Sequence, residues 1–247
     1  MNTISTQYLT LLPNIKDFKK LCKSLAALDA IISPDWESRY YSYQKEWGEN
    51  EEFFGMRDGS GDEMNILFSP NGCVINGFAH ESEMCDWKEV KIKEQKSFLK
   101  KLFGNHKKKT KLVHNTVQGV VDSLPLEFHD FIFGEPVKSI GTTFCIWRKM
   151  SDSKWNIGQL KYPNNDYSDG SSDLMYIFDN NPNTYKIWAE AYFDDTFENR
   201  TLDIKLVEYV YEGNLITKEI VRKINPELQD LEQLKTDLNE IGFEYHI

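Results

Sequence analysis

The residues with the clearest chemical potential lie in the stretch "RDGSGDE", which directly precedes an apolar run. Asp58, Ser60 and Asp62 alternate there as the first ligands of an EF-hand calcium loop do. The same motif requires glycine at the position of Glu63 and a bidentate glutamate at that of Ser69, so a complete EF-hand loop is excluded. An incomplete metal site, formed by the oxygen atoms of these three side chains, is the remaining metal-binding alternative. The simpler interpretation is a glycine-rich turn between two strands, with its carboxylates in solvent.

Arg57 opens this stretch and stands in sequence close to Asp58, Asp62 and Glu63. An arginine can pair bidentately with a carboxylate, so we expect a structural ion pair that holds the turn. Recognition of a carboxylate on a ligand or partner is the functional alternative. A phosphate-binding loop is excluded, because no GxxxxGKS/T motif occurs and the acidic neighbours would repel an anion.

His80 and Arg148 complete the set of candidate residues. His80 ends a predicted strand and stands beside Glu81. A histidine next to a carboxylate can act as a general base, but successive residues of a strand point to opposite faces. Arg148 closes an apolar run, where arginine more often pairs or extends to solvent than reacts. The predicted binding residues are Arg57, Asp58, Asp62, His80 and Arg148, and no catalytic residue is predicted.

The four cysteines are widely spaced and form no CxxC pair, so we expect reduced thiols. Cys73, His80 and Cys85 match no zinc-finger spacing and lack an evident fourth ligand. Cys145, inside "TFCIW", is predicted to be an inert core thiol. Neither a metal site nor a cofactor is therefore predicted.

Charge is distributed unevenly along the chain. The net charge is −10, but the ten lysines and two glutamates between 88 and 111 carry +8, which leaves −18 for the rest. This acidity disfavours nucleic-acid binding by phosphate neutralisation and suits a basic protein partner. Nine carboxylates between 166 and 203, with no histidine among them, indicate a solvated acidic face or a docking surface.

No membrane association is expected. The N-terminal residues lack a basic region followed by an apolar one, and no run of about 18 apolar residues occurs. The expected compartment is the cytoplasm. Hydrophobic residues make up 40% of the 247 residues and aromatic residues 13%, which is the composition of a globular protein with a sizeable core.

Short aromatic and β-branched segments must position the candidate residues. Four of them, between about 39 and 79, are separated by glycine-containing turns and predict an antiparallel meander. The connector "SPNG" at 69–72 suits a type I turn. The run at 142–150 is apolar on both faces up to Trp147 and predicts a central buried strand.

Helical periodicity dominates both ends of the chain. Residues 14–32 predict an amphipathic helix with Asp29 on or near its apolar face, where a carboxylate needs hydrogen bonds. In the C-terminal third, one helix is predicted to begin at Asn181-Pro182 and another at Asn225-Pro226. The second is predicted to end at Gly242.

Two connecting segments are less regular. The spacing at 115–133 predicts two short helices separated at Pro125. The lysine-rich insertion at about 88–111 is predicted to be a loop with a short helix near 94–103. Together the patterns predict a single α+β domain over 1–247, in which an N-terminal helix precedes the meander, the buried strand and a helical C-terminal third.

Four segments carry a resemblance to known proteins: "DWESRYYSYQKEW", "MRDGSGDEMNILFSPNGCVINGFAHE", "TTFCIWR" and "NPNTYKIWAEAYF". With them the chain resembles a widespread family of uncharacterised bacterial cytoplasmic proteins. The similarity spans most of the chain outside 88–111, which looks like an expanded, lysine-rich version of that region. The motifs imply no known reaction and no catalytic residue.

A looser resemblance, in fold pattern and acidity, is to the α+β immunity proteins that neutralise bacterial toxins, including the Smi1/Knr4-like group. It implies a non-catalytic protein-binding module whose acidic surface docks a basic partner. The alternative from another class is a metal-dependent hydrolase or a small-ligand-binding protein that uses Arg57, Asp58, Asp62 and His80.

Overall fold

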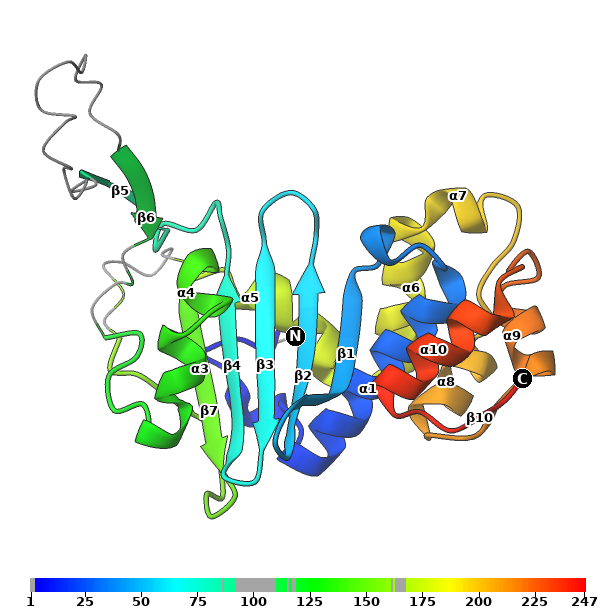
Figure 1. Cartoon of the computed structure of the whole chain (residues 1–247), viewed down its shortest axis with the longest axis horizontal. Coiled ribbons are helices and arrows are strands. Elements are labelled where there is room, and N and C mark those ends of the chain that lie inside the picture. The colour runs from blue at the N-terminus through cyan, green and yellow to red at the C-terminus, as the bar shows by residue number, and fades with distance from the viewer. Residues whose placement is uncertain are drawn as a thin grey trace, which may run out of the picture.

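The computed structural model describes residues 3–85, 87–91, 110–114, 116, 119–160, 162 and 168–247. Its frame is an antiparallel sheet in the order β1-β2-β3-β4-β7-β8 (Figure 1). The strands are β1 (Tyr41–Gly48), β2 (Glu51–Arg57), β3 (Glu63–Ser69), β4 (Gly72–Phe78), β7 (Phe144–Lys149) and β8 (Asn156–Ile157). The predicted meander and the buried strand are confirmed. β7 pairs on its outer side with only the two-residue β8, so it lies nearer the sheet edge than predicted.

The two faces of the sheet pack against different helices. Because side chains alternate along a strand, the strand register sorts them into rows. One row belongs to the larger core: Tyr43, Phe54, Ile66, Ile75 and Ile146. The neighbouring row faces the other way and, from its second member onward, belongs to a smaller core: Gln44, Phe53, Leu67, Val74 and Trp147. We call this second side the outer face of the sheet.

Helix α1 (Ile15–Ile32) packs between the sheet and the C-terminal helices (Figure 1). Asn14 caps it by accepting hydrogen bonds from Lys16 N and Asp17 N. From Leu21 onward it is buried almost all round, and its alanines let neighbouring elements approach closely. The C-terminal elements are α5 (Ser171–Met175), η4 (Tyr176–Asp179), α6 (Pro182–Tyr192), α7 (Asp194–Phe197), α8 (Ile204–Tyr211), β9 (Ile216–Thr217), α9 (Lys218–Ile224), α10 (Leu231–Ile241) and β10 (Tyr245–His246).

Two of the three predicted ends of the C-terminal helices are confirmed. Asn181 caps α6 with Pro182 in its first turn, and Gly242 ends α10 with φ 72°. The start of α10 was predicted five residues too early. It begins at Leu231 with Asp230 as its cap, because the side chain of Asn225 instead donates to Ile31 O at 2.9 Å and closes the end of α1.

The connection between β4 and β7 departs from prediction. Residues 87–91 and 110–114, expected to be loop, pair as the antiparallel strands β5 (Trp87–Lys91) and β6 (Thr110–His114). The helix expected near 94–103 lies outside the described residues. Before Pro125 the described residues 119–123 form turns, so within the described part of 115–133 only the second of the two predicted helices is present. The short helices here are η3 (Leu126–Phe128), α3 (His129–Phe133) and α4 (Val137–Ile140).

Two 3₁₀ helices, η1 (Leu9–Leu11) and η2 (Trp36–Ser38), flank α1. Within the described ranges, no helix has the length and apolar character needed to cross a membrane. The larger core contains residues from Ile4 to Ile241, so the sheet and the C-terminal helices share one hydrophobic cluster. The α+β fold class is thereby confirmed.

Asp29 is the buried polar centre of this core, as its place on the apolar face of α1 suggested. Its carboxylate is inaccessible to solvent and accepts three hydrogen bonds, from Tyr41 N at 2.9 Å, Tyr40 N at 3.2 Å and the hydroxyl of Tyr185 at 2.7 Å. Burial raises the pKa of Asp29 from 3.8 to about 7, against the opposing effect of these hydrogen bonds and of the charge of Arg39. At pH values between 3.8 and about 7, Asp29 therefore keeps its proton in the folded protein and loses it in the unfolded chain.

We expect Asp29→Asn to remove a pH dependence of stability. Between pH 3.8 and about 7 the folded state binds more protons at this site than the unfolded state, so the free energy of unfolding falls as pH rises through that window. The full effect is on the order of 4 kcal/mol. Urea unfolding at several pH values between 4 and 7.5, followed by circular dichroism, should show a shallower slope for Asp29→Asn.

Glu208→Gln, at an exposed carboxylate on α8, is the matched control and should keep the wild-type slope. Asp29→Ala should lose about 3 kcal/mol, because it leaves buried N–H groups unsatisfied and opens a cavity. Parallel pH profiles for the wild type and Asp29→Asn would contradict the assignment.

Candidate functional site

Asp58 organises the turn between β2 and β3. Its Oδ1 accepts the backbone N–H groups of Ser60 at 2.8 Å, Gly61 at 3.0 Å and Asp62 at 2.9 Å, and its Oδ2 accepts the hydroxyl of Ser60. Burial raises the pKa of Asp58, but these hydrogen bonds outweigh it and lower the pKa below its ordinary value. Because the carboxylate is occupied by its own turn, Asp58 has a structural role here.

Asp62 and His80 form a pair at the side of the same turn. Asp62 Oδ1 accepts His80 N at 2.8 Å and lies 2.7 Å from His80 Nδ1. Gly61, with φ 126°, lets the imidazole pack this closely, since a Cβ there would lie 3.2 Å from His80 Cγ. The hydrogen bond to Asp62 raises the pKa of the exposed His80. A carboxylate that orients Nδ1 leaves Nε2 to solvent, which is an arrangement that can transfer protons.

The expectation that His80 and Glu81 point to opposite faces of a strand is wrong, because β4 ends at Phe78 and both residues lie in the following turn. His80 Nε2 lies 3.9 Å from Glu81 Oε1, too far for a hydrogen bond. The two carboxylates therefore act on opposite nitrogens of one imidazole.

Arg57 makes a different contact from the one predicted. Its guanidinium stacks over the ring of Trp36 at 3.9 Å, and Nη2 donates to Trp36 O at 2.9 Å. In the described part of the chain, Arg57 takes part in no salt bridge, so the expected ion pair within the turn is not formed. The stack replaces it and ties the β2–β3 turn to η2.

Arg148 does not join this group. The register pairs it with Cys73, next to the β3–β4 connector, whereas Arg57 pairs with Glu63 at the opposite end of the strands. Its Nε donates to Asp152 O at 3.2 Å, a local contact at the end of β7. Of the five predicted binding residues, the structure therefore brings four to one end of the sheet and leaves Arg148 at the other.

The described cysteines and carboxylates form no recognisable metal-binding cluster. Across the described ranges, no three His, Cys, Asp or Glu side chains come together in a way that could hold a metal ion. No disulfide joins the four cysteines, and Cys73 and Cys145 are buried on opposite faces of the sheet. Burial raises the pKa of the Cys145 thiol, as expected for a core residue.

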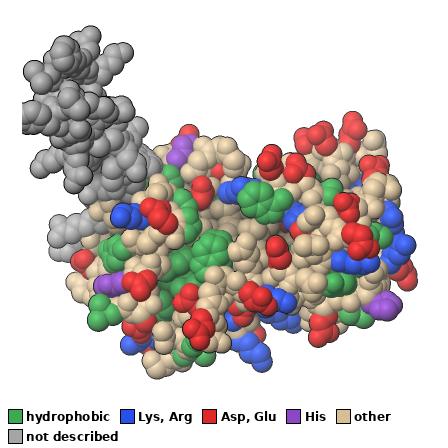
Figure 2. Space-filling model, in the orientation of Figure 1, with side chains coloured by type: hydrophobic (Ala, Val, Ile, Leu, Met, Phe, Trp, Pro, Cys, Tyr) green, Lys and Arg blue, Asp and Glu red, His purple; other side chains and the backbone are tan. Residues whose placement is uncertain are grey.

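Carboxylates gather on the edge of the molecule that holds the β2–β3 turn. Figure 1 places this turn and α7 on the same upper edge, and Figure 2 shows acidic side chains concentrated there, most densely over α7. The stack of Arg57 on Trp36 brings η2 to this edge as well. We call this surface the acidic rim; its members are Asp35, Glu37, Asp58, Asp62, Asp194, Asp195 and Glu198.

A groove crosses the outer face of the sheet beside this rim. Helices α3 and α4 cover the outer face as far as Phe53 and leave β1 uncovered, while α10 borders β1 on the other side. The resulting hollow has a volume of about 210 Å³. We call it the outer groove; its lining includes Trp36, Arg39, Ser42, Gln44, Trp47, Phe53, Pro136, Asp237 and Glu240. Figure 2 shows hydrophobic side chains gathered in the middle of this face.

Two exposed indoles flank the groove. Trp36 is 57% exposed and Trp47 is 40% exposed, although a folded protein gains by burying such large rings. Trp47 stacks on Phe53 with ring centroids 4.5 Å apart. One wall is fixed by a buried ion pair, in which Arg39 Nη2 lies 2.6 Å from Asp237 Oδ2. The groove is therefore built from ordered aromatic and charged side chains.

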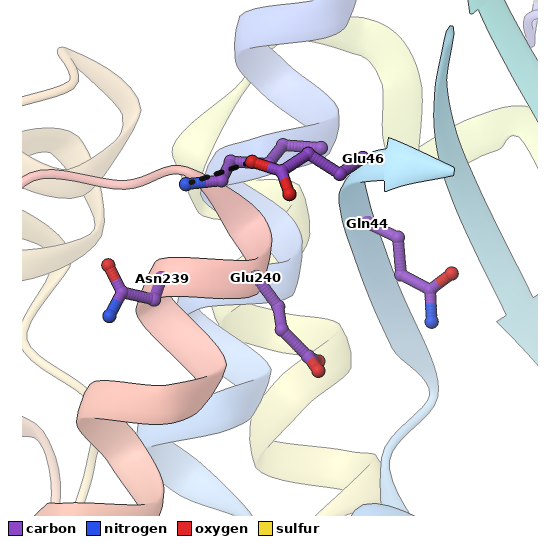
Figure 3. Close-up of a pocket in the computed structure, with 5 residues that line it drawn as sticks. Gln44, Glu46, Asn239 and Glu240 are labelled. Atoms are coloured by element: carbon purple, nitrogen blue, oxygen red, sulfur yellow. Dashed lines mark ion pairs between the residues drawn. The ribbon is translucent and has the colours of Figure 1, made fainter. Parts of the chain in front are cut away.

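A second hollow of about 430 Å³ adjoins the groove between β1 and α10, and Glu240 lines both (Figure 3). Its other lining residues are Gln44, Lys45, Glu46 and Asn239. Lys45 and Glu46 form a long ion pair of 3.8 Å with each other. This lining is polar throughout, unlike the mainly apolar walls of typical small-molecule sites.

Four lysines of α1 line a third hollow, of about 300 Å³: Lys16, Lys19, Lys20 and Lys23. The structure accounts for this cluster without a ligand. Glu52 pairs with Lys19 and with Lys23, each at 2.8 Å, and these lysines lower its pKa to about 2 although burial alone would raise it. Gly213 and Gly242, which follow α8 and α10, also line the hollow, so two helix C-termini with their partial negative charge face the lysines.

Comparisons with protein-family models, with curated proteins and with solved structures each find no match. Function is therefore inferred from geometry. The sequence-based candidates include Arg57 but not Trp36, Trp47, Arg39 or Glu240, which line the groove. The sequence does carry a signal for the two groove tryptophans. In "DWESRYYSYQKEW", Trp36 stands just before the predicted strand and Trp47 stands near its end.

We expect Asp62→Asn to lower the pKa of His80 toward its ordinary value, because the hydrogen bond from the carboxylate is the largest cause of the raised value. An NMR titration of the His80 ring protons measures this directly. Glu81→Gln is the matched control and should have a smaller effect, since its carboxylate lies 3.9 Å from Nε2. A larger shift with Glu81→Gln than with Asp62→Asn would refute the pairing.

Proposed function

We propose that this chain is a non-catalytic protein-binding module of the immunity-protein type, which acts in the bacterial cytoplasm and docks a basic protein partner on its acidic rim. The observation that carries the proposal is the exposed indole of Trp36 at the border between the acidic rim and the outer groove. Tryptophan is enriched at the energetic centres of protein interfaces, where charged residues surround an apolar anchor.

Charge supports a basic partner. Outside 88–111 the chain carries −18, and the acidic rim concentrates seven carboxylates near three positively charged or titratable groups, Arg57, His80 and Arg200. A surface of one predominant sign steers an oppositely charged protein toward it and raises the association rate. The exposed Trp36 then offers the apolar contact that charge alone does not supply.

The site geometry favours binding over catalysis. Asp58 is occupied by backbone N–H groups, and Arg57 is engaged by Trp36. The remaining pair of Asp62 and His80 lies on two adjoining turns, with the histidine exposed and the aspartate half-buried, outside the hollows described above. A binding surface uses these groups as they stand, whereas a hydrolase built on Arg57, Asp58, Asp62 and His80 would need Asp58 to leave its turn.

We expect the doubly reversed variant Asp194→Lys/Asp195→Lys to lose at least about tenfold in affinity for the basic partner, because like charges then face each other across the interface. The immobilised protein should first recover a basic protein from native lysate at low salt and release it as the salt concentration rises. Affinity of the recovered partner is then measured by surface plasmon resonance for both chains.

The control is Glu208→Lys/Glu212→Lys, which makes the same change in net charge on α8 and at the residue that follows it, away from the acidic rim. It should bind within about twofold of the wild type at physiological salt, where charges beyond about 8 Å are screened. Equal losses for the two variants, or recovery of no basic protein at all, would overturn the proposed function.

A further inference from the structure

We propose that the outer groove receives one arginine side chain of the basic partner, whose guanidinium lies against the aromatic wall and pairs with Glu240. This inference rests on the proposed function, because it names what the partner inserts beside the acidic rim. It would make the outer groove the specific part of the interface and the acidic rim the steering part.

The aromatic wall suits a planar cation. Trp36, Trp47 and Phe53 all line the groove, and the two indoles are open to solvent on its sides. A guanidinium stacks on such rings by cation–π attraction and is less strongly hydrated than an ammonium group. The molecule already contains one example, since Arg57 stacks over Trp36 at 3.9 Å.

Glu240 supplies the carboxylate. Asp237, one turn earlier on α10, is committed to Arg39 at 2.6 Å and to Gln233 at 3.0 Å. Glu240 is exposed, and among the described residues it takes part in no ion pair and accepts no side-chain hydrogen bond. Figure 3 shows that the side chain of Glu240 leaves α10 on the side of that helix where β1 and its residue Gln44 lie. A planar guanidinium can pair with such a carboxylate through two parallel hydrogen bonds.

The dimensions favour a side chain over a free metabolite. At about 210 Å³ the groove is smaller than the roughly 300 to 1,000 Å³ of typical small-molecule sites. The polar hollow between β1 and α10 is a separate space that adjoins the aromatic groove at Gln44 and Glu240, which leaves room beside the groove for the backbone of a bound segment. A single side chain presented by a larger molecule fits these dimensions.

The interior of the groove fixes where the cation stops. Arg39 and Asp237 lie at its inner wall with side chains 6% and 7% exposed, and the two charges neutralise each other. A positive charge would gain nothing by passing beyond Glu240 toward Arg39. The guanidinium is therefore expected between the indoles and Glu240.

The test uses the whole chain and a hexa-arginine peptide as the probe, followed through the indole N–H signals of Trp36 and Trp47 by NMR and through affinity by calorimetry. The wild type should bind with shifts of both indole signals. Glu240→Gln should weaken binding about five- to tenfold, and hexa-lysine should bind the wild type more weakly by a similar factor. Glu208→Gln is the matched control, with the same change in net charge, and should change affinity less than about twofold.

Trp47→Leu provides a second variant, which should reduce affinity about fivefold while its thermal unfolding stays cooperative. Equal weakening by Glu240→Gln and Glu208→Gln, or no change in either indole signal, would show general charge attraction and overturn the assignment. If groove variants leave partner affinity intact while rim reversal abolishes it, the arginine site fails and the proposed function stands. If neither the groove variants nor the rim reversal changes partner affinity, both the arginine site and the proposed function fail.

Discussion

A fully buried carboxyl group, which makes no ion pair with any described residue, constrains the whole molecule. Asp29 on α1 is satisfied only if the backbone N–H groups of Tyr40 and Tyr41 and the hydroxyl of Tyr185 are all in place. These groups come from the start of β1 and from α6, so one side chain fixes a helix, the first strand and a C-terminal helix against each other. An unsatisfied carboxylate in this core would cost several kcal/mol, which selects the native arrangement over close alternatives.

The surface that we propose for binding follows from that arrangement. With the start of β1 held at Asp29, the preceding residues pass over its end, where Arg39 reaches Asp237 of α10 and Trp36 meets Arg57. Helices α3 and α4 are short and cover the outer face only up to Phe53. The uncovered part of β1 and the bordering α10 therefore leave a groove, and the residues that border it are held by contacts on their other sides.

Local sequence patterns were sufficient to predict most helices and strands, whereas the arrangement of the candidate site depends on contacts between residues far apart in sequence. Alternation and turn residues were sufficient for β1 to β4 and for the β2–β3 turn, and helical spacing placed Asp29 in the core before any partner was known. The start of α10 was misplaced because Asn225-Pro226 has the local pattern of a helix start. The side-chain amide of Asn225 instead donates to the carbonyl groups of Ile31 and Ile32 at the end of α1, which are 194 and 193 residues away in sequence. The contact of Arg57 with Trp36 spans 21 residues and has no local signature, so the charges next to Arg57 suggested an ion pair that is not formed.

The stack of Arg57 on Trp36 also bears on how such a groove could bind. A free indole at the surface would lose rotamer entropy when a partner ordered it. Here the guanidinium at 3.9 Å and the hydrogen bond to the Trp36 carbonyl hold the ring before a partner arrives, and Phe53 does the same for Trp47 at 4.5 Å. The conformational cost is thus met within the folded chain. Arg57, which first suggested a ligand-binding charge, is better understood as the residue that positions the ring of Trp36 beside the outer groove.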